Sequence, residues 1–378
     1  MRKISVILLA AIFLISGIAA CSQNPLPEDT SSITDESSSV SITEVTNETG
    51  TKASEEPATT DSSEASSVTT TEDLPDPSGY RFNAHVLPEL IVRMYGKGFE
   101  ADYYRFCDAA LAGEDSVALE NKENYSHCLD VARTCLPVAY AFLQYTDPAE
   151  AAVGDGTYKL FYTIPKEDYL IKVGKFKERV KEIIGSVYSE DASPLELALA
   201  FYSEESERID YDHDLIDEND NLVEGNIRAT SVYYVLMNNK GICQEIAGCY
   251  AYLLLQVGID ATTCTAVDTD IRYGHEWTVV KIGNNYYHCD VTKQTSHKGS
   301  ISYFGMTDEQ RNKIDDWDID TFNFGGLNVF YHDDLPINDK TFEPLWKSSS
   351  YKIDRDKHML YCYNKKSGKK AYFKMSLE

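Results

Sequence analysis

The stretch GHEWTVVKIGNNYYHCD at residues 274–290 constrains the fold more than any other part of the chain. Two runs rich in β-branched and aromatic residues flank Gly283 and Asn284, a pair that favours the two-residue turn of a β-hairpin. With this turn, Ile282 faces Asn285. The sequence therefore predicts two antiparallel strands whose register is fixed by the turn.

This register places four side chains on one face of the sheet. Counting outward from the turn, Trp277 faces Asp290 and His275 faces Thr292, and residues directly opposite one another share a face. Asp290 is then the diagonal neighbour of His275, about 7 to 8 Å away at the backbone, which is within reach of an aromatic side chain. We therefore expect His275 and Asp290 to form a pair.

A helix is predicted to begin at Cys243, shortly before the hairpin. Gly258 ends it, and DATTCTAV at residues 260–267 has the β-branched content of a buried strand. The first-turn amides and the macrodipole of a helix favour a thiolate at Cys243. Packing this helix on the sheet would bring Cys243 to His275 and Asp290.

A cysteine, a histidine and an aspartate in this chain order suit covalent catalysis by a thiol. An imidazole held by Asp290 can take the proton of Cys243 and later protonate a leaving amine. Taken singly, each residue also suits a structural role. Trp277 either walls the substrate cleft or is a core aromatic residue, and His288 is interpreted as core. Beside the Cys243 amide, the second oxyanion donor stays unassigned.

Three stretches carry a resemblance to a known family: NKGICQEIAGCYAYLLLQVGID, GHEWTVVKIGNNYYHCDVT and YFGMTDEQ. They resemble the transglutaminase-like superfamily, of papain-like fold, as found in exported bacterial proteins. The resemblance covers about residues 195–310. It implies Cys243 as nucleophile, His275 as general base and acid, and Asp290 as the residue that orients His275.

Two departures from the family pattern lie beside this site. Glu245 and Ile246 stand where relatives usually have Gly and an aromatic residue, and Lys293 stands where relatives usually have Trp. Neither removes a member of the triad. Both could alter the substrate cleft.

The first twenty residues are typical of an export signal. Arg2 and Lys3 precede an uncharged apolar run that ends with small residues directly before Cys21. This end resembles the cleavage site of bacterial lipoproteins, with a plain cleaved signal as the alternative. We expect residues 1–20 to be removed and Cys21 to be lipidated, which would hold the protein on the outer side of the cell membrane.

A disordered stalk is predicted for residues 21–79. From Ser22 to Gly79 the chain has 24 Ser or Thr among 58 residues and no aromatic residue, so it cannot form a core. The stalk carries thirteen acids, and residues 80–378 carry 48 acids against 32 bases. This balance argues against nucleic acid as a partner. Expected partners are protein or peptide substrates, including cell-wall peptide; the oligomeric state is unknown.

The rest of the chain divides into three predicted parts. Residues 80–190 form a mostly helical accessory region, residues 191–325 form the core and residues 326–378 form a β extension. Ser193 and Glu196 form a capping box that starts a helix over residues 194–206. The other expected elements are helices at 88–96, 101–111, 126–145, 176–187 and 231–239, a strand at 157–164, and three short C-terminal strands.

The sequence predicts neither a cofactor nor a metal site. The acidic run at residues 209–220 begins with calcium-loop spacing, but Leu215 and Asn221 stand where the loop needs Gly and Glu. Eight cysteines remain after Cys21, without zinc-like spacing, and we expect most to be small buried residues. No disulfide is predicted, since one working thiol would leave an odd set.

Together these features predict an α+β fold with a transglutaminase-like or papain-like core, in which the catalytic helix packs on an antiparallel sheet. The predicted activity is that of a cysteine hydrolase or acyltransferase acting at amide bonds, with water or an amine as the acceptor. The alternative is a catalytically inactive scaffold that serves as a surface binding or adhesion module.

Overall fold

The computed structural model describes residues 79–216, 231–268, 273–325, 330–331 and 335–375. The expected signal peptide, the lipidated Cys21 and the stalk up to residue 78 lie outside these residues and stay predictions. The described residues belong to one compact unit. No helix among them has the length and apolar character needed to cross a bilayer.

Helices make up most of residues 79–190. The single helix expected over residues 126–145 is divided in two, because Pro137 has no amide hydrogen to donate and Leu136 before it takes φ −142° and ψ 65°. The expected strand at 157–164 is shorter than predicted. The elements are α1 (Glu89–Tyr95), α2 (Lys97–Ala112), β1 (Ser116–Ala118), α3 (Asn124–Cys135), α4 (Pro137–Phe142), α5 (Pro148–Ala151), β2 (Ala152–Gly154), β3 (Thr157–Lys159) and α6 (Lys166–Val187).

Three further helices lead into the core: α7 (Pro194–Arg208), α8 (Val232–Asn238) and α9 (Cys243–Gln256). The predicted capping box of α7 is present, with Ser193 Oγ accepting from the amide of Glu196 at 3.2 Å. The predicted start of α9 at Cys243 is confirmed, and every residue of α9 is buried. An added Cβ at Gly248 would lie 2.6 Å from Val232, so close packing of α8 on α9 requires glycine there.

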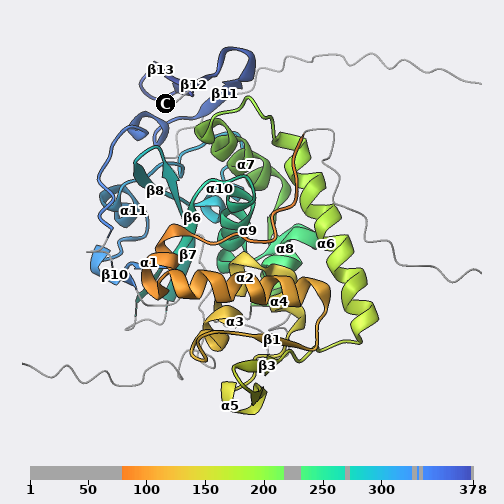
Figure 1. Cartoon of the computed structure of the whole chain (residues 1–378). Coiled ribbons are helices and arrows are strands. Elements are labelled where there is room, and N and C mark those ends of the chain that lie inside the picture. Colours follow the sequence, from red (N-terminus) through yellow and green to blue (C-terminus); the bar gives the residue numbers. More distant parts are fainter. Residues whose placement is uncertain (1–78, 217–230, 269–272, 326–329, 332–334, 376–378) are drawn as a thin grey trace, which may run out of the picture. The chain divides into compact units, whose positions relative to one another are not determined.

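The central sheet is antiparallel and has the strand order β10-β9-β6-β7-β8. Its strands are β6 (Ala261–Asp268), β7 (Tyr273–Ile282), β8 (Asn285–Cys289), β9 (Asn323–Phe324) and β10 (Phe330–Tyr331). Figure 1 shows α9 lying along β6 and β7. Thr278 Oγ1 donates a hydrogen bond to the Ala247 carbonyl at 2.8 Å, which ties the helix to the sheet. The fold is therefore α+β with a helix on an antiparallel sheet, as predicted.

The hairpin has the predicted register, because Ile282 pairs with Asn285 across Gly283, whose φ is +61°. One expectation is wrong. Strand β8 ends at Cys289, and Thr292 lies in α10 (Val291–Thr295) instead of facing His275 on a strand. The physical reason is that Asp290 accepts from the amide of Lys293 and so begins a helix where the strand was expected to continue.

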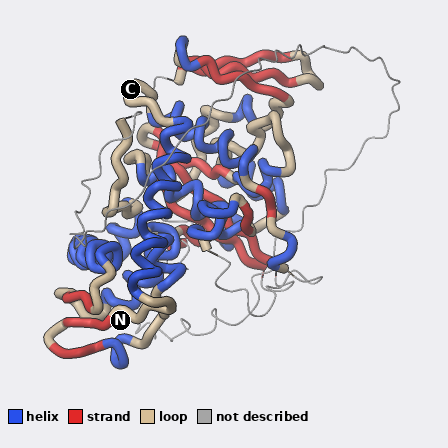
Figure 2. Tube along the Cα trace, turned by 90° about the vertical axis from the view of Figure 1, so that its right-hand side faces the viewer, coloured by secondary structure: helices blue, strands red, loops and turns tan. Residues whose placement is uncertain are grey.

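A second antiparallel sheet lies near the C-terminus, in the order β11-β12-β13 (Figure 2). Leu360 and Cys362 on its inner face are buried in the main hydrophobic core. Its strands are β11 (Ser350–Asp354), β12 (Met359–Asn364) and β13 (Lys369–Lys374). The remaining elements are β4 (Asp210–Tyr211), parallel to β5 (Lys240–Gly241), together with α11 (Asp308–Asp315) and the 3-10 turns η1 (His213–Leu215), η2 (Ile319–Thr321), η4 (Glu343–Leu345) and η5 (Arg355–Lys357).

The eight cysteines of the described residues are all buried and form no disulfide with one another. The prediction that most are small buried residues is confirmed. In the stretches of chain that the structure describes, no three His, Cys, Asp or Glu side chains are grouped to hold a metal ion.

Candidate active site

Cys243 is the first residue of α9 and is fully buried. Ile242 precedes it as the N-cap and provides no side-chain hydrogen bond to the helix. The amides of the first turn of an α-helix point along the helix axis, and the positive end of the helix favours a negative charge near Cys243. Gly241 is required before this start, because a Cβ there would overlap Val235 on α8.

The course of the chain sets which end of β7 lies nearest Cys243. Helix α9 is joined to β6 by a short link, and Ala261 at the start of β6 pairs with Val280 on β7. The C-terminal end of α9 is therefore beside Val280. Ala247 contacts Thr278, and Cys243 lies one turn earlier, toward the end of β7 that carries His275.

His275 and Asp290 are in direct contact, as the hairpin register predicted. His275 Nε2 lies 2.8 Å from Asp290 Oδ2, and both side chains are buried. Because Nε2 of His275 is bonded to this carboxylate, any proton exchange of the ring with another group takes place at Nδ1. The carboxylate fixes both the orientation of the ring and its tautomer.

Asp290 is held as a carboxylate by three neighbours. Besides His275, it accepts from the backbone amide of Lys293 at 2.9 Å, and Arg311 Nη2 lies 3.3 Å from its Oδ2. Burial by itself would raise the pKa of Asp290, but the positive charges of His275 and Arg311 outweigh it and hold that pKa below the usual value. The residue that orients His275 is thus ionised at neutral pH.

A network of buried charges continues away from Asp290. Arg311 Nη1 is 2.8 Å from Asp315 Oδ2, and Lys293 Nζ is 2.8 Å from Asp315 Oδ1. Burial would raise the pKa of Asp315, yet the neighbouring positive charges lower it well below its usual range. The departure at Lys293 is thereby explained, since its backbone supports Asp290 and its side chain pairs with Asp315.

Trp277 is a buried core residue that supports this network. Its indole N–H donates to His288 Nδ1 at 2.8 Å, and the guanidinium of Arg311 lies 4.0 Å from the centre of its ring. Its exposed fraction is 1%, which favours the core reading over the tentative role in substrate binding. The ring therefore holds Arg311 from one side while Asp290 and Asp315 hold it from the other.

His288 has a defined chemical state because of its two partners. An indole N–H can only donate, so Nδ1 of His288 accepts and carries no hydrogen. Nε2 then donates to Asp308 Oδ1 at 2.9 Å, and the second oxygen of Asp308 accepts from the amide of Ile337 at 2.7 Å. His288 is a neutral core histidine, as interpreted from the sequence, and it positions Trp277.

The departure at Glu245 lies in a second buried polar cluster beside Cys243. Gln244 donates to one oxygen of Glu245, and the other oxygen is buried without a hydrogen-bond partner. Nearby, Arg133 of α3 pairs with Glu276 of β7 at 2.6 Å. Burial raises the pKa of Glu245 to about 8, against the opposing effects of Gln244 and Arg133. Glu245 is therefore mostly protonated at neutral pH.

Sequence reasoning missed three members of the site: Arg311, Asp315 and Asp308. All three lie on α11, where Arg311 and Asp315 have the i, i+4 spacing of an ordinary surface ion pair. That spacing gave no signal that the pair would be buried against Asp290. Of the residues predicted from the sequence, His275 and Asp290 are in contact, Cys243 begins the helix that packs on β7, and Trp277 lies in the core.

Residues 181–291 match the family model described as the transglutaminase-like superfamily. The chain contains a transglutaminase-like domain. This stretch includes Cys243, His275 and Asp290, and it overlaps the residues on which the sequence resemblance was based. The match supports a thiol enzyme as the general kind of protein.

Other comparisons are more distant. No curated protein matches the chain. A candidate cysteine protease from Cytophaga hutchinsonii is similar over 31% of this chain and 37% of its own, with 16% identity and a TM-score of 0.24. A structure described as a TGase is similar over 34% of each chain, with 14% identity and a TM-score of 0.28. The chain thus spans about a third of either structure, and neither similarity is close enough to indicate an activity.

Proposed function

We propose that the transglutaminase-like domain is a cysteine enzyme that transfers an acyl group from amide bonds of protein or peptide substrates. Cys243 is the nucleophile, His275 the general base and acid, and Asp290 the residue that orients His275. The observation that carries the proposal is the buried contact of 2.8 Å between His275 and Asp290, on a strand packed against the helix that begins at Cys243.

The buried charges favour a thiolate paired with an imidazolium. Asp290 and Asp315 supply two negative charges, and Arg311 and Lys293 supply two positive charges, so the network is balanced without His275. A proton added to His275 therefore introduces a positive charge that a nearby thiolate can neutralise. An ionised thiol is the reactive form of cysteine.

The reaction proceeds in two halves. The sulfur of Cys243 attacks the amide carbonyl carbon, and the sulfur's proton resides on Nδ1 of His275. As the carbon–nitrogen bond breaks, His275 gives this proton to the leaving amine, and a thioester remains on Cys243. Water or a second amine then attacks the thioester, its proton passes through His275 to the sulfur, and the free enzyme is restored.

The start of α9 provides stabilisation for the oxyanion of each tetrahedral intermediate. The Cys243 amide belongs to the first helical turn, and the side chain of Ile242 before it does not cap the helix. Its N–H and the positive end of the helix are oriented toward negative charge without reorganisation. Removing one such donor typically slows a reaction by about 10²- to 10³-fold in other enzymes.

A peptide assay tests the reaction and separates its two outcomes. The full-length protein is incubated with a peptide library, with and without a labelled primary amine. New peptide termini that need Cys243 indicate hydrolysis, and label incorporation that needs Cys243 indicates transamidation. Cys243→Ala should abolish both, whereas Cys249→Ala, six residues further along the same helix, should retain activity. Equal activity of wild type and Cys243→Ala would refute the proposal.

A binding module without catalysis is the second candidate function. It is favoured by one observation, the complete burial of Cys243 together with His275 and Asp290. The two functions differ in how the thiol reacts with iodoacetamide near pH 6. A working site predicts labelling of Cys243 that is lost in His275→Ala, whereas an inactive site predicts labelling no faster than that of an ordinary thiol.

We also propose the location that the N-terminal sequence predicts, on the outer face of a bacterial cell membrane with a lipid on Cys21. Mass spectrometry of the mature N-terminus tests it directly. A diacylglyceryl group on Cys21, and release from the membrane fraction in Cys21→Ser, are the expected results. A mature protein that still begins at Met1 would contradict the proposal.

A further inference from the structure

The C-terminal sheet differs in charge from the rest of the chain. Residues 347–374 contain nine Lys or Arg and two Asp, whereas the whole protein has 35 Lys or Arg against 61 Asp or Glu. Four of these basic residues lie on β11 and β13, and the other five lie before β11 or in the turns between the strands. A polyanion approaching this acidic protein is therefore attracted to one region and repelled elsewhere.

The two faces of this sheet have different residues. Leu360 and Cys362 point inward and are buried, since alternate residues of a strand face opposite sides. Tyr361, Tyr363 and Tyr372 lie on the outer face. The exposed fraction is 38% for Tyr361 and for Tyr363, and 73% for Tyr372. The inner face of the sheet packs on the core, so the three large aromatic rings on the outer face are available to contact a ligand.

Lysines lie beside these tyrosines in the strand register. Tyr361 pairs with Lys352 on one side and with Tyr372 on the other, and Tyr363 pairs with Lys370. Lys374 lies at the next outward position of β13 and is exposed. We name the set the basic tyrosine face; it consists of Tyr361, Tyr363, Tyr372, Lys352, Lys370 and Lys374.

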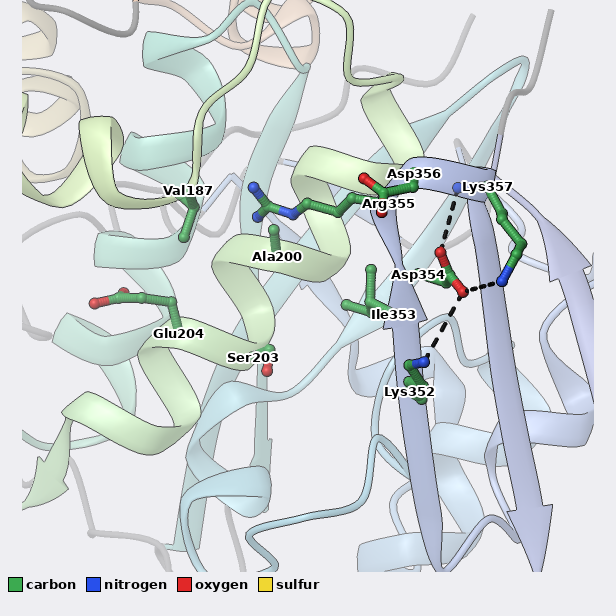
Figure 3. Close-up of a pocket in the computed structure, with 10 residues that line it drawn as sticks. All are labelled: Val187, Ala200, Ser203, Glu204, Lys352, Ile353, Asp354, Arg355, Asp356 and Lys357. Carbon is green, nitrogen blue, oxygen red and sulfur yellow. Dashed lines mark hydrogen bonds and ion pairs between the residues drawn. The ribbon is translucent and has the colours of Figure 1, made fainter.

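A cavity of about 750 Å³ adjoins this face, between α7 and the β11–η5 segment. Lys352 belongs to both the cavity and the face. Figure 3 shows the Arg355 side chain extending across the cavity to lie between Val187 and Ala200. Asp354 pairs with Lys357 at 2.9 Å and with Lys352 at 3.9 Å, and Glu204 and Asp356 also line the cavity, so its lining holds acidic groups beside Arg355.

We propose that the basic tyrosine face binds an anionic polysaccharide. Tyrosine rings on a flat sheet can stack against sugar rings, and the lysines between them can pair with carboxylate or phosphate groups on the same polymer. A bilayer fits less well, because the face has no exposed Trp, Phe or Leu and its tyrosines lie between long lysine side chains. Nucleic acid fits less well, because the N-terminal sequence predicts export from the cell.

Binding to polygalacturonate provides the first test, with its fully methyl-esterified form as the neutral control. The full-length protein should bind the charged polymer and should bind the ester at least about tenfold more weakly. Affinity for the charged polymer should fall as salt is raised, because the lysine contacts are electrostatic. Cys243→Ala should bind as well as wild type, which separates this proposal from the enzymatic one.

Two triple variants test the face itself. Tyr361→Thr, Tyr363→Thr and Tyr372→Thr together remove the rings but keep strand-favouring residues, and Lys352→Gln, Lys370→Gln and Lys374→Gln together remove the charges. Each should weaken binding about tenfold or more. Unchanged urea unfolding curves would show that the variants remain folded.

Matched controls replace exposed residues elsewhere, with Tyr145→Thr for the ring set and Lys97→Gln, Lys172→Gln and Lys175→Gln for the charge set; these should bind normally. The proposal is overturned if neither triple variant weakens binding, or if the polysaccharide is not bound. Tighter binding to phosphatidylglycerol vesicles or to single-stranded oligothymidine would overturn it in favour of a membrane or a nucleic acid.

Discussion

Replacing Arg311 by methionine should destabilise the protein more than most single substitutions. Arg311 is fully buried, contacts Asp290 at 3.3 Å and Asp315 at 2.8 Å, and lies over the ring of Trp277. Methionine fills similar space but removes the one side chain that pairs with both buried carboxylates, which leaves His275 beside Asp290 and Lys293 beside Asp315. Breaking a buried ion pair from one side typically lowers the free energy of unfolding by about 3 to 5 kcal/mol.

The decrease in free energy of unfolding caused by Arg311→Met depends on pH because Asp290 and Asp315 titrate. The pKa of Asp290 and that of Asp315 lie below the usual value in the folded protein, so their ionisation stabilises the fold above the unfolded pKa of about 3.8. That stabilisation is lost as pH falls toward the folded pKa. Without Arg311 the pKa values of both carboxylates are higher, so this stabilisation begins to be lost at a higher pH. The gap between wild type and Arg311→Met should therefore be largest at neutral pH and should narrow below about pH 4.

Urea unfolding at pH 7 and at several lower pH values measures both quantities. Arg311→Lys is the matched control: it keeps one charge but cannot bridge both carboxylates, so it should fall between wild type and Arg311→Met. A loss below about 1 kcal/mol at pH 7, typical of an exposed ion pair, would refute the reasoning. The reasoning would also be refuted if the difference in free energy of unfolding between wild type and Arg311→Met did not change with pH, because packing alone would then explain it.

Three further changes have defined outcomes. Asp290→Asn should lower activity in the peptide assay by roughly 10³- to 10⁴-fold, because His275 loses the charge that orients it; wild-type activity would contradict the triad. Trp277→Phe should reduce the free energy of unfolding by about 1 to 3 kcal/mol, because Nδ1 of His288 loses its donor; full stability would argue against the assigned tautomer. For Glu245, whose pKa rises from 4.5 to about 8 on folding, stability should fall as pH rises through this window. Glu245→Gln should remove about 1.4 kcal/mol per pH unit of that slope, and an unchanged slope would show that Glu245 does not titrate there.

The sequence by itself determined the local features of this protein. The turn at Gly283 and Asn284 set the hairpin register, and that register brought His275 to Asp290 because side chains on a pleated strand alternate with a fixed period. Ser193 and Glu196 set the start of α7, and the spacing of apolar residues set α9. These features depend on residues close together in the chain, so their geometry can be counted along it.

Tertiary structure decided what surrounds these elements. Helix α11 carries Arg311 to Asp290, and nothing in its own sequence distinguishes that pairing from a solvated one. The cap by which Asp290 ended the expected strand is local, but the same carboxylate is also held by Arg311, which comes from α11. The tyrosines of the C-terminal sheet gathered on one face only when three strands paired. Contacts between distant segments depend on the packing of the whole chain, which no local pattern encodes.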